Sequence, residues 1–111
     1  MTDRLAARLD DLAARGATMS YGELAHDLAI PGPGSIATLT GALETLMEQD
    51  ARAGRPLRAA LCRARLSDLP AQGFFDHAEH LGCYAGGPAG ENARNFVAKT
   101  RTALFEAAKS R

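Results

Sequence analysis

Apolar side chains recur at helical spacing from the start of the chain. The leucines of the first segment stand at i, i+4 and i+7, as Leu5, Leu9 and Leu12. This spacing predicts an amphipathic helix over residues 3–15 that ends at Gly16. A second, short helix is expected from Ser20, because the sequence SYGE gives Ser20 and Glu23 the spacing of a capping box.

The longest predicted helix of the first half follows a stiff reversal. The sequence PGPG at residues 31–34 ends the second helix, since proline lacks an amide proton and disfavours helix in the preceding residue. Ser35 is the expected N-cap of the next helix, over residues 36–53. Its apolar stripe consists of Ile36, Leu39, Leu43, Leu46 and Met47. Gly54 ends this helix, and Pro56 prevents it from resuming.

The periodicity changes after Pro56. Apolar and polar positions alternate imperfectly over residues 57–66, which favours a β-strand. The segment SDLPAQG is a turn. Phe74 and Phe75 then begin either a short return strand or a helix that runs through Leu81, and the pattern leaves both open.

The end of the chain predicts a glycine-rich connector and one more helix. We divide the chain into a winged-helix-like domain (1–84), a flexible connector (85–92) and a C-terminal amphipathic helix that packs on the same domain (93–111). The predicted fold class is therefore mostly α (α+β). Two helices meet at a tight turn, a short β element follows, and the order is that of a winged helix.

The distribution of charge is more informative than its sum, which is zero over 111 residues. Residues 16–51 contain five acids and no lysine or arginine, whereas residues 52–65 contain five arginines and no acid. An acidic helical part and a basic extended part are expected. No apolar run is long enough to span a membrane and no signal peptide is recognisable, so we expect a cytoplasmic protein with no membrane contact and with Cys62 and Cys83 as free thiols.

The stretch TMSYGELAHDL, the Gly/Pro turn and a helix closing in GAL resemble the helix-turn-helix domain of O6-alkylguanine-DNA alkyltransferases and alkyltransferase-like proteins. The resemblance covers residues 16–66 and implies a shared scaffold. Those enzymes carry a Pro-Cys-His-Arg motif after this helix, but here Pro56 is followed by Leu57, Arg58 and Ala59. Ala37 takes the place of the arginine that helps to push out the target base. These departures from the family pattern argue against alkyl transfer, and no catalytic residue or cofactor is assigned.

The first functional hypothesis is a non-catalytic module that binds double-stranded DNA through a basic wing and tail. Its predicted contact residues are Ser35, Thr38, Arg52, Arg55, Arg58, Arg63, Arg65 and Arg101. Cations would supply most of the affinity by neutralising phosphates. The hypothesis requires these guanidinium groups to gather on one exposed side and not to be neutralised by carboxylates of the same chain.

The alternative is a protein–protein adaptor on the same scaffold, with the acidic helix 36–53 as its contact face. A helical stripe left uncovered would also allow the chain to form a homodimer. The segment DHAEHLGC places His77, His80 and Cys83 near one another, but a zinc site would need a further ligand from elsewhere. We therefore assign no metal site and predict no enzyme activity.

Overall fold

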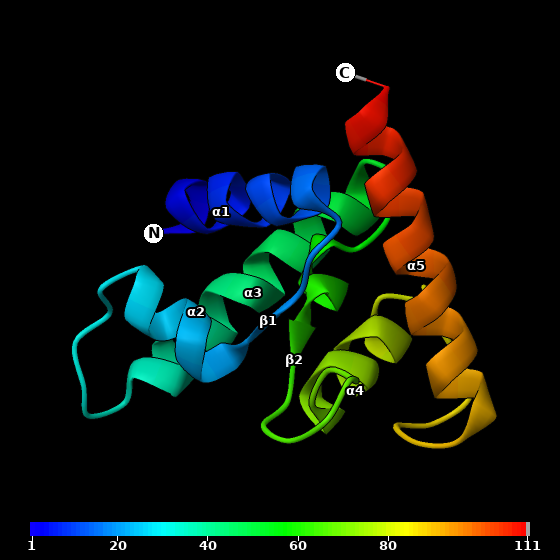
Figure 1. Ribbon diagram of the computed structural model, residues 1–111. Helices are drawn as coiled ribbons and strands as arrows, with labels where there is room; N and C mark the ends of the chain where they lie inside the picture. Colours follow the sequence, from blue (N-terminus) through cyan, green and yellow to red (C-terminus); the bar gives the residue numbers. More distant parts are fainter. Residues whose placement is uncertain (111) are drawn as a thin grey trace.

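The computed structural model describes residues 1–110 and consists mainly of helices. Its elements, in chain order, are α1 (Thr2–Arg15), β1 (Met19–Ser20), α2 (Tyr21–Asp27), α3 (Ser35–Arg52), the 3-10 helix η1 (Arg58–Leu61), β2 (Cys62–Arg63), α4 (Gln72–His80) and α5 (Glu91–Lys109). In Figure 1, α1 lies across the upper left of the molecule and α5 rises along its right side to the C-terminus at the top. The predicted class, mostly α with a short β element, is confirmed.

The local signals of the first half produce the helices that they predict. Gly16 ends α1 in the left-handed conformation, with φ at 64°. At the start of α2, Ser20 Oγ accepts a hydrogen bond from the Glu23 amide at 3.2 Å, and Glu23 Oε1 accepts one from the Ser20 amide at 3.1 Å. The capping box is thus formed. The third helix begins one residue earlier than predicted, because Gly34 is its N-cap and Ser35 is already helical.

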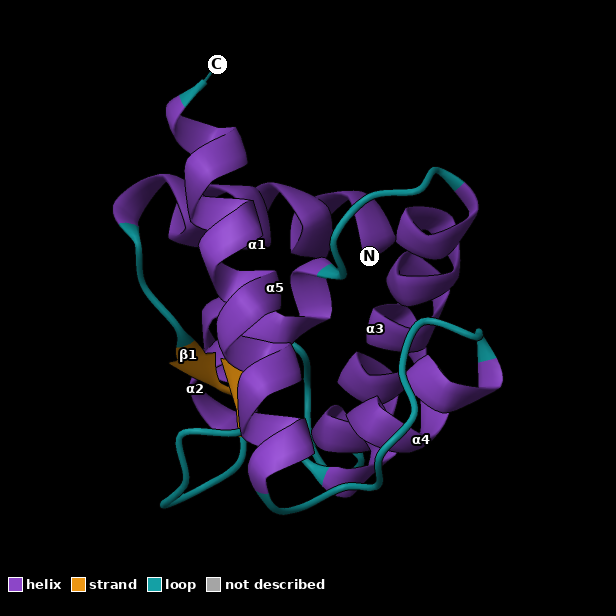
Figure 2. Ribbon diagram, turned by 90° about the vertical axis from the view of Figure 1, so that its right-hand side faces the viewer, coloured by secondary structure: helices purple, strands orange, loops and turns teal. Residues whose placement is uncertain are grey.

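The segment after Pro56 is the main departure from the sequence prediction. Instead of a strand over residues 57–66, the chain forms η1 and then only two residues of strand β2. Strand β2 pairs in parallel with β1, with Met19 opposite Cys62. Figure 2 shows how short the two orange strands are beside the surrounding helices. The small side chains of Ala59 and Ala60 are fully enclosed, and η1 lies against α1, α3 and α5. A compact turn therefore fits this central position better than a strand.

The later helices resolve the alternatives that the sequence left open. Phe74 and Phe75 belong to a helix, α4, which ends at His80, one residue before the predicted Leu81. Helix α5 begins two residues before the predicted position and packs against α1. Arg111, the end of the predicted C-terminal segment, lies outside the described residues. Flexibility of the connector 85–92 stays a prediction.

The core forms where the apolar faces of α1, α2, α3, α4 and α5 meet. Its fully enclosed large side chains include Leu5, Leu9, Leu24, Leu39, Leu46, Leu61 and Phe75. Ile36, the first residue of the predicted α3 stripe, is an exception, because 47% of it is exposed. Within residues 1–110, no helix combines the length and the apolar character that crossing a bilayer would require.

The two cysteines should differ sharply in reactivity towards a thiol reagent such as DTNB. Both are free, but Cys62 is buried and Cys83 is exposed. Burial raises the pKa of the Cys62 thiol to about 12, against the weaker opposing effect of the Arg101 charge. At pH 8 we expect one thiol to react rapidly and the other only on unfolding, since the thiolate is the reactive form. Cys83→Ser should abolish the rapid phase. Two rapid thiols in the wild type would contradict the burial of Cys62.

Candidate functional site

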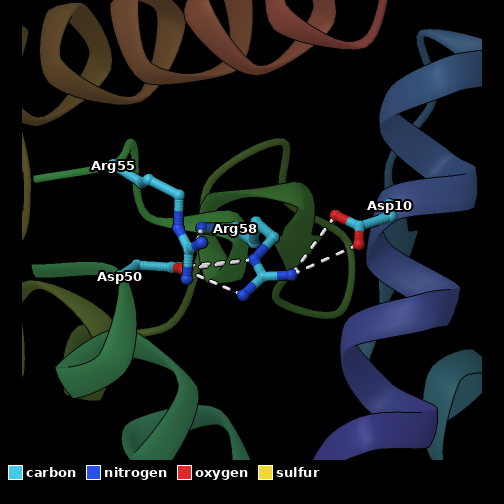
Figure 3. A network of polar contacts seen from close by, with 4 residues as sticks. All are labelled: Asp10, Asp50, Arg55 and Arg58. Atoms are coloured by element: carbon cyan, nitrogen blue, oxygen red, sulfur yellow. Dashed lines mark hydrogen bonds and ion pairs between the residues drawn. The ribbon is translucent and has the colours of Figure 1, made fainter. Parts of the chain in front are cut away.

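Arg58 is held inside the molecule between two acids (Figure 3). Its Nη2 atom lies 2.9 Å from Asp50 Oδ1, and its Nη1 atom lies 3.3 Å from Asp10 Oδ2. The backbone amide of Arg58 also donates to Asp50 Oδ2 at 3.0 Å. Burial by itself would lower the pKa of Arg58, but the hydrogen bonds and charges of Asp50 and Asp10 raise it. Arg55 joins the cluster, with Nη2 3.3 Å from Asp50 Oδ1.

Two further arginines of the predicted DNA-binding set also make hydrogen bonds and ion pairs within the chain. Arg63 lies 3.5 Å from Glu23 Oε1, and its Nε atom donates to Thr18 Oγ1. Arg101 is buried in α5, where its Nε atom donates to the carbonyl oxygen of Ala60 at 2.8 Å. Burial lowers the pKa of Arg101, and the nearby Asp68 carboxylate partly offsets that effect. Both arginines therefore help to hold β2 and η1 in place.

The remaining members of the set are two exposed arginines and two residues of α3. Arg52 and Arg65 are exposed, and neither forms an ion pair with any residue in the range 1–110. Ser35 and Thr38 lie in the first turn of α3, whose side chains include no cation until Arg52. Arg55, Arg58, Arg63 and Arg101 are each paired with an acid of the same chain. The DNA-binding hypothesis requires guanidinium groups that are not neutralised by carboxylates of the same chain, and these four arginines do not meet that requirement.

A groove of about 240 Å³ opens between α2, α3 and α4. Helix α3 contributes one wall with Ile36, Thr40, Leu43, Glu44 and Met47. Phe74 of α4 and Tyr21 of α2 lie among the residues of the other walls. The groove is therefore mostly apolar, and it lies along the part of α3 from Ile36 to Met47, which contains no basic residue.

The helical repeat explains why α3 can serve both the core and the groove. Leu39 and Leu46 are completely buried in the core. Ile36, Leu43 and Met47 recur at i, i+7 and i+11, which places them along a neighbouring strip of the same helix. The apolar stripe thus serves both, because Leu43 and Met47 are buried core residues that also line the groove. Its edge at Ile36 stays accessible from the groove.

A hydrogen bond joins two lining residues of the groove, Tyr21 of α2 and Ala71 just before α4. The backbone amide of Ala71, just before α4, donates to Tyr21 Oη at 3.0 Å. Burial raises the pKa of Tyr21 to about 12, so the hydroxyl is neutral at physiological pH. Residues 20–23 form the capping box at the same end of α2. Tyr21 therefore lies at the capped end of α2, and its hydroxyl holds the start of α4.

Glu44 is the one charged side chain among the described residues that line the groove. It is half-buried, and within residues 1–110 it makes no hydrogen bond or ion pair. A carboxylate at an apolar wall favours an arriving cation, because the surrounding side chains reduce its solvation. The groove can accordingly recognise an apolar group and a positive charge together.

The histidine cluster does not assemble a metal centre in the described part of the chain. The rings of His77 and His80 stack at 5.8 Å, and His77 Nε2 lies 3.3 Å from Glu48 Oε2. Cys83 lies on the exposed turn after α4. Between residues 1 and 110, no group of three or more His, Cys, Asp and Glu side chains is placed to hold a metal ion.

No family model, curated protein or solved structure matches this chain. The resemblance to the alkyltransferase helix-turn-helix stays a prediction. Sequence reasoning named helix 36–53 as a contact face but missed the groove, because the groove also needs walls from α2 and α4. A signal was available: Thr40 and Glu44 follow Ile36 at intervals of four residues, which puts polar groups beside the apolar strip.

Proposed function

We propose that the protein is a non-catalytic interaction module whose α3 groove binds a protein segment that presents an apolar side chain next to a positive charge. The main observation in support of this function is the apolar groove, whose described lining residues include a single, unpaired carboxylate, that of Glu44. Its volume is about 240 Å³, which is below the roughly 300–1,000 Å³ of typical small-molecule sites. A side-chain anchor from another protein suits this size better than a whole cofactor.

The charge of α3 supports a protein partner over a nucleic acid. Glu44 and Glu48 lie on this helix, and neither an arginine nor a lysine precedes Arg52 on it. Phosphate neutralisation supplies most of the affinity for DNA, and an acidic face opposes it. The arginines that could have compensated are largely paired with acids of the same chain. A cytoplasmic location stays a prediction.

This function can be tested by selecting peptides that bind the protein from a library of displayed random peptides. We expect the wild-type protein to enrich short peptides in which an apolar residue adjoins lysine or arginine. Ile36→Glu should weaken their binding at least about tenfold, because it places a second charge at the groove wall. Ile36 is half exposed, so the fold should tolerate the change. Ala37→Glu is the matched control, since Ala37 is the next residue, is exposed and does not line the groove.

The same protein can be titrated with duplex DNA. Binding that weakens steeply with salt, survives Ile36→Glu and is lost on Arg52→Ala with Arg65→Ala would favour the DNA-binding hypothesis instead. Enriched peptides that bind Ile36→Glu and wild-type protein equally would also contradict the groove as the binding site.

A further inference from the structure

The loop between β2 and α4 displays one leucine almost entirely to solvent. Leu66 is 96% exposed and has a positive φ of 59°. The loop is nevertheless held in shape, because the Ala64 amide donates to the Leu69 carbonyl at 2.8 Å and the Leu69 amide donates to Ser67 Oγ at 3.0 Å. A leucine rarely adopts this backbone conformation, and strained residues concentrate at functional positions. The loop therefore presents Leu66 as a fixed apolar knob.

Arg65, the neighbour of Leu66, supplies a free positive charge. Its side chain is exposed, and it makes no hydrogen bond or ion pair with residues 1–110. The pair of Arg65 and Leu66 thus has the two chemical features that the groove can recognise. The groove offers apolar walls and the unpaired carboxylate of Glu44.

We propose, on the basis of the function proposed above, that the occupant of the groove is the Arg65–Leu66 loop of a second copy of this chain. The leucine of the second copy enters beside Ile36 and Phe74, and its arginine pairs with Glu44. In the isolated chain, Leu66 cannot fill its own groove, because nearly its whole surface is exposed.

The positions of loop and groove favour a symmetric dimer. Ala71 and Gly73 line the groove and follow the loop closely in sequence. In Figure 1 the loop lies at the lower edge, between β2 and α4. Two copies related by a two-fold axis can therefore exchange loops reciprocally, so that each groove receives the loop of the other chain. The interface is small, and we expect association in the micromolar range or weaker.

Sedimentation equilibrium over a wide protein concentration range tests the loop. The wild type should self-associate, and Leu66→Asn should raise the dissociation constant at least about tenfold by removing the apolar anchor. Asparagine tolerates a positive φ, so the loop should keep its shape. Ala29→Asn is the matched control, because Ala29 is exposed and, like Leu66, is a non-glycine residue with positive φ.

Charge reversal tests the pairing. Glu44→Arg and Arg65→Glu should each abolish self-association, since like charges then meet at both contacts of the dimer. An equal mixture of the two variants should associate again as a heterodimer, because opposite charges meet at both contacts. The double variant Glu44→Arg with Arg65→Glu should also associate with itself.

The outcomes separate this inference from the proposed function. A wild type that stays monomeric, or a dimer unaffected by Leu66→Asn and by both charge reversals, overturns the proposal of a second copy. If selected peptides still bind the wild type and fail to bind Ile36→Glu, the groove remains a protein-binding site with another occupant. If that binding also fails, the proposed function fails with it.

Discussion

Asp50→Ala should lower the free energy of unfolding by about 3–5 kcal/mol, measured by urea denaturation at neutral pH. Asp50 is completely buried at the end of α3, and its carboxylate accepts hydrogen bonds from both the side chain and the backbone amide of Arg58. Its removal leaves a guanidinium group that is only 15% exposed without its main partner. Asp10, which is partly exposed, then remains the partner of Arg58 at 3.3 Å, so the buried charge is only partly compensated and the Arg58 amide is unpaired.

Arg55→Ala is the control for this substitution. Arg55 also pairs with Asp50, but 56% of its side chain is exposed. Solvent screens such a pair, so we expect a loss below about 1 kcal/mol. Replacing both central partners, as Asp50→Leu with Arg58→Met, should cost much less than Asp50→Ala alone, because no buried charge is left over. If Asp50→Ala costs no more than Arg55→Ala, Arg58 is not held by this cluster and would again be a candidate for phosphate contact.

Phe75→Ala should cost about 3–5 kcal/mol of unfolding free energy and should also abolish peptide binding in the groove. Phe75 is fully buried, and its ring meets Phe74 edge to face with centroids 5.2 Å apart and Tyr84 at 5.7 Å. It is therefore the main anchor of α4 in the core. Phe74, its neighbour, forms part of the groove. Loss of the anchor both opens a cavity and displaces that wall.

Phe75→Leu provides the graded comparison. It keeps much of the apolar volume, so we expect a loss of about 1–2 kcal/mol and retention of peptide binding under native conditions. Both variants are measured by urea denaturation and by the affinity for one selected peptide. A change within about 0.5 kcal/mol for Phe75→Ala, as at a surface position, would contradict its role as the anchor of α4.

Signals that act within a few residues predicted much of the helical structure. The Ser20 and Glu23 pair needs only its own turn to cap α2, and the structure contains both hydrogen bonds. The leucine spacing of α1 and the stripe of α3 likewise depend on a repeat internal to each helix. The third helix was predicted to begin at residue 36 and begins at Ser35, because Gly34 adopts the left-handed conformation that precedes the helix.

The candidate site was only partly predictable. The choice of α3 as a contact face followed from its charge, and that choice stays a proposal. The groove itself depends on α2 and α4 being brought against α3, and Tyr21 meets Ala71 across a separation of 50 residues. The predicted cations could be counted in the sequence, but their partners could not be identified. Asp10 and Arg58 are 48 residues apart along the chain.

By itself, the sequence determined the helix-rich class, the approximate helix boundaries and the separation of acidic and basic segments, because these follow from local periodicity, capping and composition. Only the tertiary structure decided that residues 58–63 form a 3-10 helix and a two-residue strand. It also decided that the side chains of Arg58 and Arg101 are largely buried and that Glu44 lies unpaired at an apolar groove. The physical reason is that burial and charge pairing depend on which distant segments meet, and one enclosed carboxylate such as Asp50 can neutralise the arginines that a charge count would assign to a partner.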